Sequence, residues 1–433
     1  MTAREAALRT LLACEKQDAW ADVCLKRTLK EGGLDGREAA LATRLTFGVV
    51  QNRILLDWYV DQFARGKLDA SVRNILRLGA YQLLFLTRVP ARAAVDESVK
   101  LTRQVCKNPK AAGLVNAVLR NLERNKADQI PPEDLSIRYS HPQWLVDAFT
   151  ERLGSEGAAA LLAADNGEPA IAIQHNKLKC SEEELQYSLE RDGAEVSPHP
   201  WLPGCFLLTG GGDLEALHAF QGGWFYVQDP AARLAVLAVS LKPGDKILDA
   251  CAAPGGKSFA AAIDMENTGE ITSCDIHPHK ITLIEKGAAR LGLSRVSAQV
   301  QNAKECVPAW AASFDAVLAD VPCSGLGIIR KKPDIRFKDP APLAGLPEVQ
   351  ENILNNVSAY VKPGGVLLYS TCTLLERENE GVVRTFLERH PDFALEGFAL
   401  PGPIGGVKSG MLTLWPHIHG TDGFFLAKLR KRL

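Results

Sequence analysis

The sequence lacks the features that mark membrane proteins and disulfide-stabilised secreted proteins. No apolar run approaches the roughly 18 residues that a bilayer-spanning helix needs, and the N-terminus has no signal-peptide hydrophobic region. The ten cysteines are scattered, without a C-x-x-C pair or a cysteine and histidine cluster at zinc spacing. We therefore expect a globular, cytoplasmic monomer with reduced thiols that binds neither a metal ion nor a membrane.

Two common nucleotide-binding signatures are also missing, although a glycine turn is present. Residues 249–258 read Asp-Ala-Cys-Ala-Ala-Pro-Gly-Gly-Lys-Ser, but a P-loop needs glycine at position 251, where this chain has cysteine. The dinucleotide fingerprint G-x-G-x-x-G is absent as well, since only Gly255 and Gly256 occur in the turn. Such a turn lets a ligand come close to the backbone, but it does not offer enough amide groups to bind several phosphates. It suits S-adenosylmethionine, a nucleoside cofactor that carries no phosphate.

The formal net charge of −1 hides an asymmetry along the chain. Residues 1–126 contain 22 Lys and Arg against 13 Asp and Glu, whereas residues 127–433 contain 28 against 38. The basic first part suits attraction to nucleic-acid phosphates. From charge alone, a solvated surface balanced by the acidic remainder is an equally good interpretation.

Hydrophobic periodicity divides the chain into three predicted domains. In the first, apolar residues return every three or four positions, which predicts an all-α domain at 1–126. A polar connector at 128–134 then leads into a mixed segment, for which we predict a small α+β module at 127–225. After residue 226, strands alternate with helix-length segments, which predicts a Rossmann-like, doubly wound α/β domain at 226–433.

The elements of the last two domains can be placed by residue. In the module we expect helices at 143–153, 157–165 and 181–192, and strands at 170–174 and 205–208. In the α/β domain we expect strands at 246–250, 270–275, 296–300, 314–320, 365–371 and 423–429. The apolar runs at 314–319 and 365–369 are typical of buried parallel strands.

Two cysteines follow these last two runs. Cys323 stands in Asp-Val-Pro-Cys-Ser at 320–324, and Cys372 stands in Ser-Thr-Cys-Thr at 370–373. Because open α/β sheets bind ligands at strand ends, both thiols are placed for chemistry. A thiolate that adds to C6 of a pyrimidine turns C5 into a nucleophile, which can attack an electrophilic methyl group. Most other cysteines are interpreted as small buried hydrophobes.

Other polar residues complete the predicted site, each with an alternative. Asp320 can act as the acid at N3 of the ring, provided that it is buried enough to hold a proton. Lys257 can hold either the base or Asp320. Asp275 is placed to accept hydrogen bonds from ribose hydroxyls, or it is the N-cap of the helix that follows. Asn302 either bonds the adenine edge or is a plain turn residue.

At these residues the sequence resembles a known family. A set of short runs is similar to the motifs of the Sun family of RNA 5-methylcytosine methyltransferases: Cys-Ala-Ala-Pro-Gly-Gly-Lys at 251–257, Asp-Val-Pro-Cys-Ser-Gly-Leu-Gly at 320–327, Arg-Lys-Lys-Pro-Asp-Ile at 330–335, Tyr-Ser-Thr-Cys-Thr at 369–373, Glu-Asn-Glu at 378–380 and Asp-Gly-Phe-Phe at 422–425. The runs at 3–7 and 112–121 resemble the NusB-type RNA-binding helical domain. The resemblance covers nearly the whole chain.

The resemblance implies methylation at C5 of a cytosine in small-subunit (16S) ribosomal RNA, with S-adenosylmethionine as cofactor. It implies that Cys372 is the nucleophile and that Cys323 helps to release the methylated base. It implies cofactor contacts from Cys251, Ala252, Ala253, Pro254, Gly255, Gly256, Lys257, Asp275, Asn302 and Asp320. We expect RNA contacts from Arg4, Arg88, Arg92, Arg138, His141 and Arg330. This chain departs from relatives at Asn302, where they often have Asp, and at 174–176, where they usually have an arginine-containing strand.

Other functions stay open at this point. The target can be another RNA such as tRNA, or the basic front can belong to an assembly factor with an inactive tail. The intact Cys372, Cys323, Asp320 and Lys257 argue against an inactive tail. A DNA cytosine methyltransferase generally uses the thiol after proline as its nucleophile, and a protein or small-molecule methyltransferase leaves the basic front unexplained.

Overall fold

The computed structural model describes residues 1–17, 19–210 and 212–433, and this part of the chain forms two compact units. The first, the helical unit, contains Met1–Gly167 and Ile329–Lys338. The second, the sheet unit, contains Glu168–Ile328 and Asp339–Leu433. The chain therefore leaves the sheet unit after Ile328, contributes a short segment to the helical unit, and returns.

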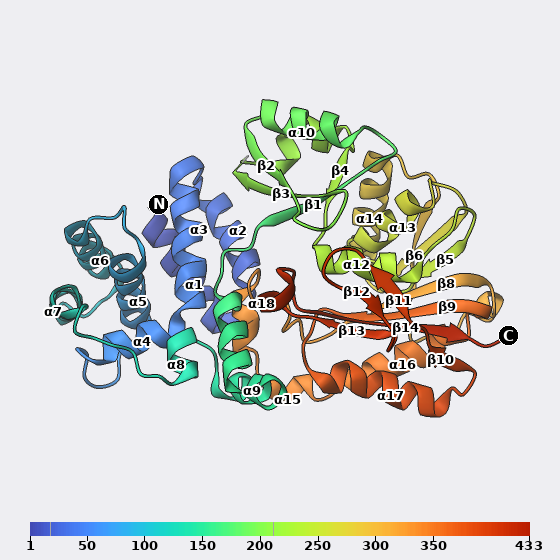
Figure 1. Cartoon of the computed structure of the whole chain (residues 1–433). Helices are drawn as coiled ribbons and strands as arrows, with labels where there is room; N and C mark the ends of the chain where they lie inside the picture. Colours follow the sequence, from blue (N-terminus) through green and yellow to red (C-terminus); the bar gives the residue numbers. More distant parts are fainter. Residues whose placement is uncertain (18, 211) are drawn as a thin grey trace. The chain divides into compact units, whose positions relative to one another are not determined.

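Figure 1 shows that the helical unit is built from helices. Their apolar faces pack together into a core. Leu45, Leu56 and Ile75 are completely buried because they stand on the apolar stripes of their helices. Asp69 caps one helix by accepting a hydrogen bond from the amide of Ser71 at 2.8 Å. The helices are α1 (Ala3–Gln17), α2 (Ala21–Gly32), α3 (Gly36–Gln51), α4 (Arg53–Asp61), α5 (Ala70–Phe85), α6 (Ala91–Val105), α7 (Lys110–Asn125), α8 (Leu135–Tyr139), α9 (Gln143–Asp165) and the 3₁₀ helix η3 (Pro333–Phe337).

Arg336 fixes the segment Ile329–Lys338 inside the helical unit. Its completely buried guanidinium donates hydrogen bonds to the carbonyl oxygens of Gln51 at 3.1 Å and Ser140 at 3.2 Å, and to Oδ1 of Asn166 at 2.8 Å. Burial lowers the pKa of Arg336 to about 10, so the side chain stays charged at neutral pH. The sequence motif at 330–335 thus belongs structurally to the helical unit.

The sheet unit begins with a small α+β module. Its antiparallel sheet has the strand order β2-β3-β1-β4. Ser181 and Glu184 form a capping box at the start of its main helix, which confirms that helix. The elements are β1 (Ile171–His175), α10 (Glu182–Arg191), β2 (Ala194–Pro198), β3 (Cys205–Gly210), η1 (Leu214–Ala216), α11 (His218–Gln221) and β4 (Phe225–Val227).

The Gln-His-Asn run at 174–176 joins this module to the rest of the unit. Nδ2 of the buried Asn176 donates to the carbonyl oxygens of Leu291 at 3.0 Å and Gly223 at 2.9 Å. Gln174 is also buried and donates to the carbonyl oxygen of Gln228 at 3.1 Å. These two amides are therefore used for internal hydrogen bonds.

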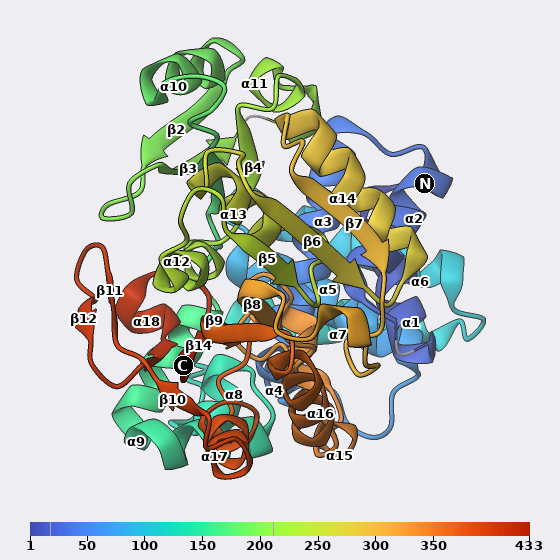
Figure 2. The same cartoon turned by 90° about the vertical axis from the view of Figure 1, so that its right-hand side faces the viewer.

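The larger sheet of this unit has the strand order β10-β14-β9-β8-β5-β6-β7, with β13 paired to β14. The strands from β9 to β7 in this order are parallel, and β14 is antiparallel to β9. Helices α12, α13 and α14 cover one face, and α16 and α17 cover the other (Figure 2). The bounds are α12 (Pro230–Val239), β5 (Lys246–Asp249), α13 (Gly256–Asp264), β6 (Glu270–Asp275), α14 (Pro278–Leu291), β7 (Val296–Val300), η2 (Pro308–Trp310), β8 (Phe314–Asp320), α15 (Pro340–Leu343), α16 (Leu346–Ser358), β9 (Val361–Thr371), η4 (Glu376–Glu378), α17 (Glu380–Arg389), β10 (Phe393–Leu395), β11 (Phe398–Leu400), β12 (Gly405–Val407), β13 (Met411–Leu414), α18 (Pro416–His419) and β14 (Phe424–Lys431).

The predicted fold class is confirmed: a helical part, an α+β module and a doubly wound α/β part follow one another. The strands predicted at 270–275, 296–300 and 314–320 have the same bounds in the structure. The last predicted strand forms, but it runs antiparallel to β9, which an alternation of elements does not reveal. Strands β2, β4 and β10 to β13 were not expected, because each spans only three to five residues and carries little periodicity.

Candidate active site

Neighbouring parallel strands of the larger sheet end at one edge, and each places a polar residue there. Asp249 ends β5, Asp275 ends β6 and Asp320 ends β8, while Cys372 directly follows β9. Cys323 lies in the loop that leaves β8. Because the carboxyl ends of parallel strands meet at one edge, the fold collects most of the predicted site residues there.

The thiols of Cys323 and Cys372 lie side by side at this edge. Their sulfur atoms are 3.3 Å apart, within hydrogen-bonding distance, although the two residues are 49 positions apart in sequence. Hydrogen bonding with Cys372, together with burial, raises the pKa of the Cys323 thiol well above its usual value. Cys323 therefore keeps its proton at neutral pH and can donate a hydrogen bond to a thiolate at Cys372.

Buried polar contacts fasten the loop of Cys323 to the segment after Cys372. The amide of Ser324 donates to Oε2 of Glu378 at 2.9 Å, and the hydroxyl oxygens of Ser324 and Thr373 are 2.6 Å apart. Glu378 is completely buried, and its Oε2 also accepts from Nε2 of Gln350 at 2.9 Å. No role for Glu378 followed from the sequence, because these partners are 54 and 28 positions away.

Gly327 lets the chain pass between Cys372 and Gly423. Its amide donates to the carbonyl oxygen of Cys372 at 2.9 Å, and its own carbonyl oxygen accepts from the amide of Gly423 at 2.8 Å. A Cβ atom at position 327 would overlap the carbonyl oxygens of both neighbours. Glycine is therefore required where the 320–327 run ends.

Lys257 holds Asp320 at the end of β8. Its Nζ lies 2.7 Å from Oδ2 of Asp320, whose Oδ1 accepts a hydrogen bond from the hydroxyl of Ser370 at 2.8 Å. The ammonium group also lies 5.1 Å from the ring centroid of Phe424. Of the two contacts weighed for Lys257, the one with Asp320 is present in the structure. The Asp320 side chain is 30% exposed, so it can still reach a ligand at the edge.

The glycine turn between β5 and α13 has a conformation that suits close approach. Gly255 has a φ of 111°, in the region that residues with a side chain rarely adopt, and it precedes the first turn of α13. Its amide donates to the carbonyl oxygen of Ala252 at 2.7 Å, and the amide of Ala252 donates to the carbonyl oxygen of Cys274 at 2.7 Å. The Ala253–Pro254 peptide bond is cis. The turn is thereby tied to the end of β6.

Asp249 connects the end of β5 to the first turn of α13, which follows the glycine turn. It is completely buried, and its Oδ2 accepts a hydrogen bond from the hydroxyl of Ser258 at 2.7 Å. Burial raises the pKa of Asp249 to about 6, and burial likewise raises the pKa of the neighbouring Cys251 thiol. Cys251 is therefore a protonated thiol and not a candidate nucleophile.

Asp275 is nearly buried at the end of β6. Its Oδ1 accepts a hydrogen bond from the amide of His277 at 3.0 Å, and its Oδ2 lies 3.5 Å from Nζ of Lys280. The N-cap of α14 is His277 itself, so Asp275 bonds the amide before the helix and is not the helix cap that was the alternative interpretation. Its carboxylate lies at the same edge as the glycine turn, so the ribose contact stays a prediction.

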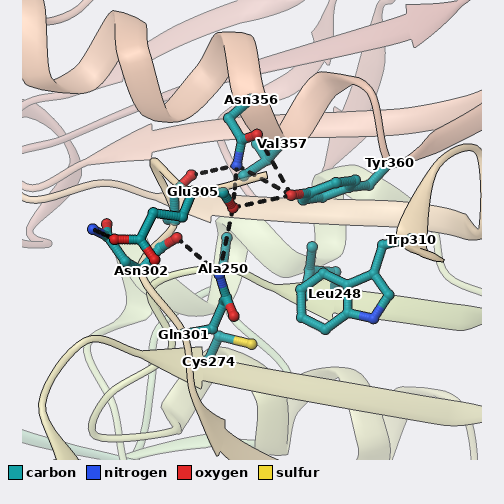
Figure 3. A pocket seen from close by; sticks show the side chains of 11 residues that line it. Leu248, Ala250, Cys274, Gln301, Asn302, Glu305, Trp310, Asn356, Val357 and Tyr360 are labelled. Carbon is teal, nitrogen blue, oxygen red and sulfur yellow. Dashed lines mark hydrogen bonds between the residues drawn. The ribbon is translucent and has the colours of Figure 1, made fainter. Parts of the chain in front are cut away.

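Asn302 follows β7 and lines a small pocket (Figure 3). Its Nδ2 donates to Oε1 of Glu305 at 2.9 Å, and its Oδ1 accepts from the amide of Lys304 at 3.1 Å. The free volume of the pocket is about 10 Å³, the space of one water molecule. Asn302 thus forms the plain turn, and its contact with an adenine edge stays a prediction.

The residues expected to contact RNA all lie in the helical unit, in different settings. Arg88 and Arg138 are exposed, and Arg92 is exposed at 3.5 Å from Asp96. Nε of Arg4 donates to Oε1 of Gln82 at 2.9 Å. Arg330 is partly buried within the segment Ile329–Lys338.

His141 requires a correction. Its side chain is completely buried, with Nδ1 2.7 Å from the carbonyl oxygen of Tyr139 and Nε2 3.7 Å from Oδ2 of Asp165. Burial lowers the pKa of His141 well below its usual value, so the ring is neutral. A neutral ring without exposed surface is not placed to contact RNA, and we assign it to the packing of the helical unit.

The charges at the strand edge favour a nucleoside over a nucleotide. Asp249, Asp275 and Asp320 are carboxyl groups, and the ammonium of Lys257 is paired with Asp320. Such a set suits ribose hydroxyls and a cationic sulfonium better than phosphates. Within the described residues, no group of three or more His, Cys, Asp or Glu side chains could hold a metal ion. No helix in the same part of the chain is long and apolar enough to cross a membrane.

Family models match all three parts of the chain. The model described as 16S rRNA methyltransferase RsmB/F matches residues 236–430. The NusB family model matches residues 1–124, and the RsmF/B-like ferredoxin-like domain model matches residues 141–215.

Similar proteins extend over nearly the whole length. The probable ribosomal RNA small subunit methyltransferase B of Bacillus subtilis is 36% identical over 443 residues, which cover 99% of this chain and 98% of that protein. The ribosomal RNA small subunit methyltransferase B of Klebsiella pneumoniae is 32% identical and covers 92% of this chain and 91% of its own. The crystal structure of PH0851 has a TM-score of 0.80 at 26% identity and covers 100% of this chain and 99% of its own.

The fold and the site together define an S-adenosylmethionine-dependent methyltransferase. NSun6 from Pyrococcus horikoshii with SFG shares this fold at a TM-score of 0.60 and 24% identity, covering 67% of this chain and 98% of its own. The chain belongs to the family of 16S rRNA methyltransferases RsmB/F. The resemblance to the Sun family, including its NusB-type helical part, is thereby confirmed.

Proposed function

We propose that this protein methylates C5 of a cytosine in small-subunit ribosomal RNA, with Cys372 as the nucleophile and Cys323 as the residue that assists release. The observation that carries the proposal is the 3.3 Å separation of the two sulfur atoms at the ends of neighbouring strands. A single thiol would suffice for attack. The second thiol, held by its own anchored loop, is what a two-cysteine release step requires.

Attack begins at Cys372. The Cys372 thiol gives its proton to water, and the thiol of Cys323, whose sulfur lies 3.3 Å away, is placed to donate a hydrogen bond to the thiolate that remains. This thiolate adds to C6 of the cytosine, and the ring electrons move toward N3, which takes up a proton from a water molecule that hydrogen-bonds to the Asp320 carboxylate. The Lys257 ammonium keeps Asp320 in place for this contact. The adduct is an enamine whose C5 is a carbon nucleophile.

Methyl transfer is followed by release. S-adenosylmethionine supplies an electrophilic methyl group when it is bound, with the 251–257 turn and Asp275 as its main contacts and Asn302 at the adenine. After C5 has taken the methyl group, the proton on C5 passes to water, the C5–C6 double bond re-forms and the bond from C6 to Cys372 breaks. N3 then returns its proton to water. The thiol of Cys323 donates a hydrogen bond to the leaving sulfur, which makes that sulfur a better leaving group.

The substrate class is supported by the relatives and by charge. The similar proteins of Bacillus subtilis and Klebsiella pneumoniae are named ribosomal RNA small subunit methyltransferases. The first 126 residues are strongly basic, and Arg4, Arg88, Arg92, Arg138 and Arg330 remain our candidates for phosphate contacts. We keep 1–126 as the RNA-binding part, 127–225 as the RNA-contacting module and 226–433 as the catalytic part.

A comparison of single cysteine variants tests the roles of the two thiols. We expect Cys372→Ser to abolish methyl transfer to small-subunit rRNA. We expect Cys323→Ala to attack the base but to accumulate a covalent protein–RNA adduct, visible on a denaturing gel. The exposed Cys306 supplies the control, since Cys306→Ser is expected to behave as wild type. Loss of methyl transfer in Cys323→Ser but not in Cys372→Ser would reverse the assignment.

A further inference from the structure

Gly113 stands inside α7 without a packing reason in this chain. Glycine in a helix interior destabilises the helix relative to alanine. Other helical glycines have a cause, since a Cβ at Gly48 would overlap the ring of Tyr81 and one at Gly79 would press on Leu119. A Cβ at Gly113, which is exposed, would meet nothing within 4 Å. A missing side chain at an open position points to close approach by something outside the chain.

The space above Gly113 is a basic hollow. It has a volume of about 380 Å³ and lies between α6 and α7, where Lys100 and Arg103 line it opposite Asn116. Asp96 also lines the hollow, and its carboxylate is 3.5 Å from Nε of Arg92. The negative charge of Asp96 is thereby compensated within the unit.

The basic surface continues around the turn between α6 and α7. A second hollow, of about 520 Å³, is lined by three lysines, Lys67, Lys107 and Lys110, and by one carboxylate, Asp69, which accepts a hydrogen bond from the amide of Ser71. Lys100 is held by Glu97 at 2.6 Å. In the described part of the chain, by contrast, Arg103, Lys107 and Lys110 form no ion pair. Their charges are available to an anionic partner.

We propose that this surface, defined by Gly113, Arg103, Lys107 and Lys110, binds the sugar–phosphate backbone of the RNA substrate. The three cations neutralise phosphates. The RNA backbone comes closest to α7 at Gly113, where the helix has no side chain. An RNA occupant matches the charge of the surface and the excess of cations in residues 1–126. This inference rests on the proposed function and adds a binding surface apart from Arg4, Arg88 and Arg92.

Two variants of the full chain test the surface. Gly113→Leu fills the place where the backbone would approach, and Arg103→Gln, Lys107→Gln and Lys110→Gln together remove the three charges. The size-matched control is Ala40→Leu on the exposed surface of α3, and the charge-matched control replaces three exposed cations of the sheet unit, Lys242→Gln, Lys286→Gln and Lys408→Gln. The measurements are the affinity for a transcribed small-subunit rRNA by fluorescence anisotropy at several salt concentrations, methyl transfer at saturating RNA, and the melting temperature.

We expect Gly113→Leu to bind the transcript at least about tenfold more weakly, with a melting temperature no lower than that of wild type. The triple variant is expected to lower the salt slope of binding by about 2, since each phosphate of a single strand that the protein neutralises adds about 0.7 to the slope. Both variants keep the wild-type rate at saturating RNA. If wild type methylates the transcript while both variants bind it as tightly as the controls do, the surface serves a protein partner or none, and the inference fails. If wild type itself does not methylate the transcript, the proposed function fails instead.

Discussion

Nζ of Lys257 lies 2.7 Å from Oδ2 of Asp320, and this ion pair joins the first turn of α13 to the end of β8. The side chains are 10% and 30% exposed, so the pair is only partly desolvated. It connects the glycine turn to the loop that carries Cys323. The pair thus links the two halves of the candidate site through residues 63 positions apart, in addition to the pairing of β5 with β8.

Lys257→Met leaves the carboxylate of Asp320 without its cation at the strand edge. We expect kcat to fall about 10²-fold or more, the usual effect of losing a group that supports proton transfer. Stability is expected to drop by about 1–3 kcal/mol, between the values for exposed and buried pairs. Lys246→Met, which breaks the more exposed pair with Glu270, is the control. An unchanged kcat in Lys257→Met would remove this ion pair from the mechanism.

Glu378→Ala deprives two buried donors of their shared acceptor. The amide of Ser324 and the side chain of Gln350 would both lose Oε2 of Glu378, so we expect a loss of about 2–4 kcal/mol in the free energy of unfolding. Glu378→Gln keeps an acceptor oxygen and is expected to lose less. Chemical denaturation measures both. The neighbouring Glu376 is 64% exposed, so Glu376→Ala serves as the control, and an equal loss there would contradict the anchoring role.

Asp275→Ala tests the predicted ribose contact. We expect the Kd for S-adenosylmethionine to rise about tenfold to hundredfold, as for loss of a hydrogen bond to a charged group. Isothermal titration calorimetry measures the change, and Asp245→Ala, just before β5 and away from the carboxyl edge, is the control. An affinity equal to wild type would place the ribose hydroxyls on another residue.

Asp249→Asn is predicted to change how stability depends on pH. The pKa of Asp249 is about 6 in the folded protein, above the usual unfolded value of about 3.9, so the folded state binds more protons between these two pH values. Stability of the wild type therefore falls as the pH rises from about 4 to about 6, by up to about 3 kcal/mol.

Asparagine at 249 keeps an acceptor for the Ser258 hydroxyl but carries no titrating proton. We expect the stability of the variant not to decrease between pH 4 and pH 6. Its stability relative to that of wild type is therefore expected to be greatest at pH 7. Urea unfolding midpoints across pH 4 to 7 measure the difference, and Asp128→Asn at an exposed site is the control. The same pH profile in Asp249→Asn and wild type would show that Asp249 does not titrate in this range.

Local sequence pattern was sufficient for much of the fold. The strands β6, β7 and β8 were predicted with the bounds that they have in the structure, and β8 in particular is a largely apolar, buried stretch between turn residues. The glycine turn at 255 and the two thiols after strands were also visible, since a strand exit is a local feature. Short strands such as β4 and β10 could not be predicted from the sequence, because they form by pairing with strands elsewhere in the chain.

The sequence by itself determined which elements form and which chemical groups stand at their ends. Only the tertiary structure decided which of these groups meet. Cys323 reaches Cys372, Glu378 reaches Ser324, and Arg336 enters the helical unit beside Gln51, 285 positions away. The physical reason is that strand order and helix packing set these contacts, and both depend on burial summed over the whole chain. The same packing buries His141, and the local sequence pattern could not predict that burial.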